Sequence, residues 1–89
     1  MTYKVVLSPH AARDYKKLNP SLKPKIQAAI DSLQHQPLSG PKIKRLKGRL
    51  REYYRYRMDD YRIVYTLAED RIVYIDYIQH RKDVYRNIE

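Results

Sequence analysis

The 89-residue chain contains no cysteine, no phenylalanine and no tryptophan, and only three histidines. The absence of cysteine excludes a disulfide framework and any chemistry that needs a thiolate. The histidines, His10, His35 and His80, are too widely spaced to predict a zinc site. We therefore expect the protein to use no metal and no other cofactor.

The sequence also lacks long hydrophobic runs. No stretch approaches the roughly 20 apolar residues that a membrane-spanning helix needs, and the apolar run near the start is too short for a signal peptide. We therefore expect a cytoplasmic protein with no membrane partner. A chain of this length supports one modest hydrophobic core, so residues 1–89 are expected to form a single domain.

Positive charge is what the sequence has in excess. Nineteen Lys and Arg residues against ten Asp and Glu residues leave a net charge of +9 at pH 7. This excess predicts a polyanionic partner, most commonly nucleic acid. Residues 42–62 carry nine of the basic side chains and only three acidic ones. All ten aromatic residues are tyrosine, which can fill a core and also offer a hydroxyl group.

The first half of the chain predicts a short strand and two helices. Residues 2–7 have strand character, after which Ser8 is a typical N-cap and Pro9 fits the first helical position. The first helix should last about three turns. Its inner face is expected to carry Ala12, Tyr15 and Leu18.

The second helix is expected to begin within residues 19–25. Pro24 must lie in its first turn, because deeper in the helix it would remove a hydrogen bond and clash with the preceding turn. Apolar residues then recur at helical spacing at Leu22, Ile26, Ala29, Ile30 and Leu33. The two helices should form a hairpin, followed by a loop around Gly40 and Pro41.

After Glu52 the apolar period changes to two, which predicts a meander of three strands at about 52–58, 61–67 and 71–79. Asp59-Asp60 and residues 68–70 would form the turns, because aspartate tolerates left-handed backbone conformations. A short helix at about 82–88 should follow. The predicted fold class is α+β in the order β-α-α-β-β-β-α, with the helical hairpin on one face of an antiparallel sheet.

The two-residue turn fixes the register of the first hairpin of the meander. Arg57 should lie opposite Arg62, and both should share the open face of the sheet with Arg55. Like charges placed opposite each other destabilise a sheet, so this arrangement favours a prepared anion site. A three-residue turn at 68–70 leaves an alternative, in which Asp76 lies beside Arg62 as an ordinary surface ion partner.

The last predicted strand delivers His80 and Arg81 at its end, with Tyr85 about one helical turn further on. Cleavage of RNA without a metal needs a base for the 2′-hydroxyl proton, positive charge for the pentavalent phosphate and help for the departing 5′-oxygen. A tyrosine near several guanidinium groups can serve as the base, because positive charge favours the phenolate. Tyr85 could equally pack the last helix on the sheet, and His80 could be a solvated strand-end histidine.

Further basic residues are candidates for holding an RNA backbone electrostatically without taking part in chemistry. This set of RNA-binding candidates comprises Lys44, Lys47, Arg49, His80 and Lys82.

With these residues identified, the sequence resembles the RelE/ParE superfamily of bacterial toxins, and more narrowly the RelE-like messenger-RNA interferases. The resemblance covers nearly the whole chain. It is carried by "LSPHAARDYKKL", by "KRLKGRLREYYRYRMDDYRIVY" and by the terminal "HRKDVY".

The resemblance implies a toxin that enters the ribosomal A site and cuts mRNA without a metal, leaving a 2′,3′-cyclic phosphate and a 5′-hydroxyl. It implies that Tyr85 is the base, that Arg81 lies beside the leaving oxygen and that Arg62 stabilises the phosphate. Arg55 and Arg57 stand where family members often have lysine, so they are expected to supply charge rather than protons. Gln79 stands where glycine is common.

The resemblance also implies partners. They are the ribosome and mRNA, and an antitoxin whose acidic, amphipathic segment wraps the basic surface in a hetero-oligomer. Two other functions remain open at this point. One is that of a ParE-like toxin, which shares the fold but poisons DNA gyrase without nuclease activity, and the other is that of a non-catalytic RNA-binding module.

Overall fold

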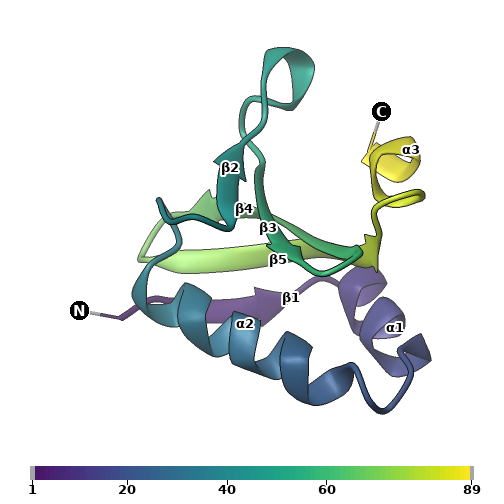
Figure 1. Cartoon of the computed structure of the whole chain (residues 1–89). Coiled ribbons are helices and arrows are strands. Elements are labelled where there is room, and N and C mark those ends of the chain that lie inside the picture. Colours follow the sequence, from purple (N-terminus) through teal and green to yellow (C-terminus); the bar gives the residue numbers. More distant parts are fainter. Residues whose placement is uncertain (1, 89) are drawn as a thin grey trace.

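The computed structural model describes residues 2–88 and, within them, the side chains of residues 2–86. It is an α+β fold, as predicted (Figure 1). In chain order its elements are β1 (Lys4–Leu7), α1 (Pro9–Lys17), α2 (Lys23–His35), β2 (Ile43–Arg45), the short 3₁₀ helix η1 (Gly48–Leu50), β3 (Tyr54–Met58), β4 (Tyr61–Ala68), β5 (Ile72–His80) and α3 (Val84–Ile88).

The sheet differs from the prediction in two respects. It has five strands in the order β1-β5-β4-β3-β2, because the short edge strand β2 pairs with β3. It is also mixed rather than antiparallel, because β1 runs parallel to β5. The order is therefore β-α-α-β-β-β-β-α.

The helices begin where the sequence predicts. The Ser8 hydroxyl accepts a hydrogen bond of 2.9 Å from the backbone N–H of Ala11, and Pro9 occupies the first turn of α1. In this helix Ala11, rather than the expected Ala12, is fully buried. In α2, Pro24 lies in the first turn, and four predicted core residues are buried: Ile26, Ala29, Ile30 and Leu33.

The β3–β4 hairpin has the predicted register. Arg57 pairs with Arg62, Tyr56 with Ile63 and Tyr54 with Tyr65. Asp59 in the turn has a φ of 53°, a left-handed conformation that aspartate tolerates.

The next hairpin contains a bulge that the sequence did not reveal. Val64 pairs with Tyr77 but Tyr65 pairs with Ile75, so Asp76 is an extra residue in β5. As a result Arg62 pairs with Gln79. The alternative arrangement, with Asp76 beside Arg62, is therefore wrong.

The two faces of the sheet have different coverings. Helices α1 and α2 pack on one face and enclose the main core, whose largest buried side chain is Tyr65. The Tyr65 hydroxyl donates a 2.6 Å hydrogen bond to the Pro37 carbonyl, and burial raises the pKa of this tyrosine. Helix α3 and the β2–β3 hairpin tip rise on the opposite side (Figure 1), where Val84 and Val64 are also fully buried. None of the helices among the described residues has the length and apolar character that a membrane span requires.

Candidate functional site

The strongest concentration of candidate residues lies on the face of the sheet opposite α1 and α2, here called the open face. Alternation along β3 and β4 places the side chains of Arg55, Arg57 and Arg62 on this face. Two of them, Arg57 and Arg62, border a cleft of about 560 Å³. We call it the arginine cleft, and its lining residues are Lys42, Arg57, Asp59, Asp60, Arg62 and Arg81.

The acidic turn between β3 and β4 holds two of these arginines in place. The Arg62 guanidinium donates a 2.9 Å hydrogen bond to the backbone carbonyl of Asp59. The backbone N–H of Arg81 donates to the Asp60 carbonyl at 2.8 Å, and the Arg81 side chain lies 3.7 Å from the Asp60 carboxylate. The turn thus brings the end of β5 to the start of β4, although Arg62 and Arg81 are 19 positions apart in the sequence.

The electrostatics of Arg62 show which groups converge on it. Burial is the main cause that lowers the pKa of the Arg62 guanidinium below its ordinary value, and the charge of Arg55 is the next. Arg81 and Arg57 lower it further, whereas Tyr85 acts in the opposite direction. Four guanidinium groups and one phenol are therefore gathered in one place, and an anion bound among them would relieve their mutual repulsion.

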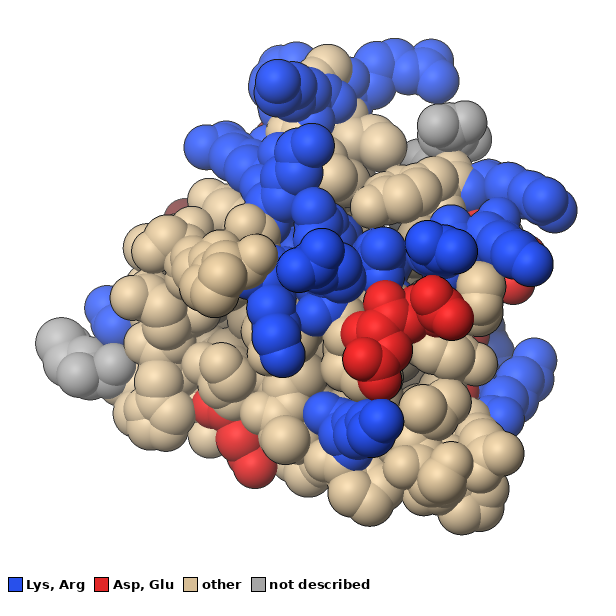
Figure 2. Space-filling view, in the orientation of Figure 1, with Lys and Arg blue, Asp and Glu red and all other residues tan. Residues whose placement is uncertain are grey.

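The candidate RNA-binding residues lie around this cluster. Lys44 on β2 pairs with Arg55 on β3, so it extends the basic row of the open face. Lys47 and Arg49 lie in the hairpin tip around η1, and Lys82 lies in the turn after β5; all three are exposed. Figure 2 shows Lys and Arg side chains running from the top of the molecule across its middle, beside one compact acidic patch.

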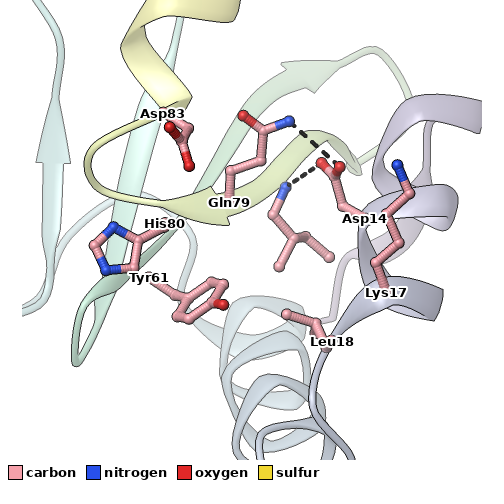
Figure 3. Close-up of a pocket in the computed structure, with 8 residues that line it drawn as sticks. Asp14, Lys17, Leu18, Tyr61, Gln79, His80 and Asp83 are labelled. Atoms are coloured by element: carbon pink, nitrogen blue, oxygen red, sulfur yellow. Dashed lines mark hydrogen bonds between the residues drawn. The ribbon is translucent and has the colours of Figure 1, made fainter.

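His80 lies apart from the arginines. It occupies a second cleft of about 240 Å³ on the helix side of the sheet, where its ring meets the Tyr61 ring edge-on at 5.6 Å between centroids (Figure 3). We call this the His80 cleft; besides these two residues it is lined by Asp14, Lys17, Leu18, Ile78, Gln79 and Asp83. The structure therefore brings together the predicted catalytic arginines and Tyr85, but not His80.

Two residues have places at these clefts that the sequence did not predict: Lys42 was expected only on a solvated basic face, and Asp14 was not singled out. Lys42 lines the arginine cleft, and its backbone carbonyl accepts a 2.8 Å hydrogen bond from Arg57. The pairing of β2 with β3 is what brings Lys42 to the arginine cleft. Asp14 on α1 accepts hydrogen bonds from the Ile78 N–H at 3.1 Å and from the Gln79 amide at 3.3 Å, and so ties α1 to β5 (Figure 3).

No group of three or more His, Cys, Asp or Glu residues that could hold a metal ion occurs in the part of the chain that the structure describes.

A match to the sequence model of one protein family shows to which family the chain belongs. Residues 5–85 match the sequence model of the ParE toxin of type II toxin-antitoxin systems, parDE. The chain belongs to this family of toxins. It is thus a type II toxin of the RelE/ParE superfamily.

Solved structures support the same assignment. The toxin is 28% identical to a chain of the RelBE2 toxin-antitoxin complex from Mycobacterium tuberculosis, with a TM-score of 0.78 over 91% of the toxin and 100% of that chain. It is also 28% identical to a chain of the YoeB dimer from Staphylococcus aureus, with a TM-score of 0.71 over 88% and 95% of the two chains. The archaeal RelE-RelB complex from Pyrococcus horikoshii shares the fold at 24% identity, with a TM-score of 0.77 over 93% of the toxin and 99% of that chain. A comparison with curated protein sequences gives no significant match.

Proposed function

We propose that the toxin is a ribosome-dependent endoribonuclease that cleaves mRNA in the A site without a metal ion and thereby inhibits translation. The observation that carries this proposal is the convergence of Arg55, Arg57, Arg81 and Tyr85 on Arg62. Such a cluster offers a phosphate several charge-assisted hydrogen bonds and has a phenol within electrostatic reach. The 28% identity to chains of the RelBE2 and YoeB structures supports the choice of the RelE branch.

In the proposed mechanism Tyr85 is the general base. Its phenolate oxygen takes the proton of the ribose 2′-hydroxyl, and the 2′-oxygen attacks the adjacent phosphorus. The bond from phosphorus to the 5′-oxygen then breaks, which gives a 2′,3′-cyclic phosphate and, after that oxygen takes up a proton, a 5′-hydroxyl. Guanidinium groups that are already held in place favour this attack. They need no reorganisation when negative charge develops on the phosphate oxygens in the transition state.

The arginines would share the developing negative charge. Arg62 lies at the centre of the cluster and is assigned to the phosphate, with Arg55 and Arg57 beside it. Arg81, held by the Asp60 carbonyl, is assigned to the side of the leaving oxygen. A guanidinium stays protonated under all ordinary conditions, so these residues would stabilise charge rather than transfer protons.

The exposed basic residues would hold the RNA backbone. Lys44 continues the basic row of the open face, and Lys47 and Arg49 extend it along the hairpin tip. Lys82 would add a contact near the end of β5. Contacts of this type set affinity and orientation but carry no sequence information.

An antitoxin is the proposed second partner. Relatives of known structure include a RelBE2 toxin-antitoxin complex and a YoeB-YefM complex. We infer that an acidic, amphipathic antitoxin segment covers the basic surface of this toxin and orders on binding, because the net charge of +9 favours such a partner.

A ParE-like activity is the second candidate, and the match to the ParE family model favours it. In that case the toxin would poison DNA gyrase by binding protein, and the arginine cluster would have no chemical role. A non-catalytic RNA-binding module would also use the charge, but it would give Tyr85 no function. Because one fold hosts both activities, fold similarity cannot choose between them.

The test is to add purified toxin to a translating extract and to map new 5′ ends on the mRNA. Cuts in codon register, dependent on the ribosome, are the expected result. A parallel assay of gyrase with supercoiled DNA covers the second candidate. Intact mRNA together with inhibited gyrase would replace the nuclease assignment with the ParE-like one.

A further inference from the structure

We propose that His80 is a positioning residue that fixes the turn between β5 and α3, and thereby the placement of Arg81 and Tyr85. This inference rests on the proposed nuclease function and gives a role to a residue that lies outside the arginine cleft. The turn spans residues 81–83. The groups that it must place are Arg81 at its start and Tyr85 in the first turn of α3.

The His80 ring bonds directly to the turn that follows it. The backbone N–H of Lys82 donates a 3.1 Å hydrogen bond to His80 Nδ1, and the backbone N–H of Asp83 donates to the His80 carbonyl at 2.9 Å. A side chain that accepts from the N–H two residues further on reproduces the bond of an Asx turn, which asparagine and aspartate usually make. His80 thus closes the turn twice, once through its ring and once through its backbone.

The direction of the hydrogen bond from Lys82 determines which ring nitrogen of His80 carries the proton. A backbone N–H can only donate, so Nδ1 must be the unprotonated nitrogen and Nε2 must carry the proton. The edge-on contact with Tyr61 holds the ring at this angle (Figure 3). Tyr61 also pairs with His80 across the sheet, so the support comes from the start of β4.

The turn at 81–83 is short, and the site residues Arg81 and Tyr85 lie within it and directly after it. Arg81 is attached to the Asp60 carbonyl through its backbone N–H, and Val84, the first residue of α3, is fully buried. A five-residue helix has little stability of its own, so its position depends on this anchor and on the turn that leads into it. Loss of the Lys82 bond would let Arg81 and Tyr85 move relative to Arg62. Misplacement by about 1 Å can lower a rate by about 10²-fold.

Two variants of the same size separate this role from simple packing. His80→Asn keeps an acceptor oxygen at the position of Nδ1, whereas His80→Leu has nearly the same shape as asparagine but no acceptor. Both lose the ring contact with Tyr61. We expect the Asn variant to stay within a few-fold of the parent in single-turnover cleavage of A-site mRNA, and the Leu variant to be roughly 10- to 100-fold slower. Ribosome affinity should be the same for both variants.

The second measurement is the hydrogen exchange of the Lys82 amide by NMR, which does not depend on the nuclease assignment. We expect protection in the parent and in His80→Asn, and faster exchange in His80→Leu. Equal cleavage rates for the two variants, whether both are high or both are low, would overturn the positioning role. If the parent cleaves no mRNA, the proposed function fails, and equal Lys82 exchange in the two variants would then reject the role of His80 independently.

Discussion

At the scale of single residues, the open face places like charges together at a cost to the fold. Arg57 pairs with Arg62, and the charges of Arg55, Arg57 and Arg81 all lower the pKa of Arg62. Repulsion between close like charges destabilises a sheet unless a ligand relieves it. This arrangement does not favour the stability of the free toxin, and it is what we expect of a surface that binds an anionic partner.

The first prediction concerns the base. Tyr85→Phe keeps the ring and its packing and removes one oxygen, so the melting temperature should change little. Single-turnover cleavage of A-site mRNA should fall by about 10²- to 10⁴-fold, the usual loss when a general base is removed. Tyr53→Phe, which loses the same atom outside the proposed mechanism, is the matched control. Equal rates for the parent and Tyr85→Phe would remove Tyr85 from the chemistry.

The second prediction concerns the charge at the centre of the cluster. Arg62→Ala should lower cleavage by about 10²-fold or more, because one fixed positive charge at the phosphate is lost. Growth arrest by the expressed toxin should disappear with it. The melting temperature should not fall, since the substitution relieves repulsion by its neighbours. Arg13→Ala on the exposed face of α1 loses the same charge and is the control. Undiminished toxicity of Arg62→Ala would contradict the assignment.

The third prediction concerns Asp76, the bulged residue of β5. Its partial burial raises the pKa of its carboxyl group in the folded state. The folded toxin therefore holds this proton more tightly than the unfolded chain, so the associated stability is present at low pH and is lost as pH rises through the folded pKa. Near pH 7 the ionised carboxylate is destabilising, and Asp76→Asn should raise the free energy of unfolding.

The measurement is urea unfolding of the parent and Asp76→Asn at about pH 7 and about pH 3. The gain in stability should be present at the higher pH and should shrink at the lower one, where both side chains are neutral. Asp70→Asn, in an exposed turn whose left-handed φ of 62° asparagine tolerates, should show no such gain. A gain that is equal at both pH values would show that ionisation of Asp76 is not its cause.

At the scale of secondary-structure elements, the parts that could be predicted are those set by short-range sequence. Ser8 and Pro9 define the start of α1, and the two-residue turn at Asp59 fixes the pairing of β3 with β4. That pairing was enough to place Arg55, Arg57 and Arg62 on one face. The arginine half of the candidate site therefore followed from local pattern and turn length.

The features that could not be predicted depend on contacts between distant segments. Strand β2 has only three residues, and it is a strand because β3 offers a free edge. The parallel pairing of β1 with β5 joins the two ends of the chain. The bulge at Asp76 depends on how two strands pair, and it makes Gln79 the residue that pairs with Arg62. The side of the sheet that His80 faces depends on this register as well.

The fourth prediction concerns the basic hairpin. Replacing Lys44, Lys47 and Arg49 together by Ala should weaken ribosome binding and reduce its dependence on salt. Each lost phosphate contact should lower the slope of log affinity against log salt by about one. The control removes the same charge from exposed positions elsewhere, in Lys4, Arg13 and Lys16. If the two triple variants have the same slope, the RNA does not lie along the β2–β3 hairpin.

At the scale of the whole molecule, the two faces of the sheet differ in composition: one is covered by the core and the other carries the basic cluster. The face under α1 and α2 encloses the main core. The open face carries the arginine cluster. Helix α3 and the β2–β3 hairpin tip rise separately on this side of the sheet (Figure 1). Relatives can share a fold while the side chains of one face change, so we expect the open face to distinguish a RelE-like nuclease from a ParE-like toxin.

The most direct measurement of the central claim is single-turnover cleavage, by the parent toxin, of ribosome-bound mRNA that carries either ribose or 2′-deoxyribose at the scissile nucleotide. If the arginine cleft and Tyr85 catalyse attack by the 2′-hydroxyl, the ribose substrate will be cut to a 2′,3′-cyclic phosphate and a 5′-hydroxyl, and the deoxyribose substrate will remain intact. Cleavage of both substrates at similar rates would contradict the 2′-hydroxyl mechanism. Cleavage of neither would contradict the nuclease function itself.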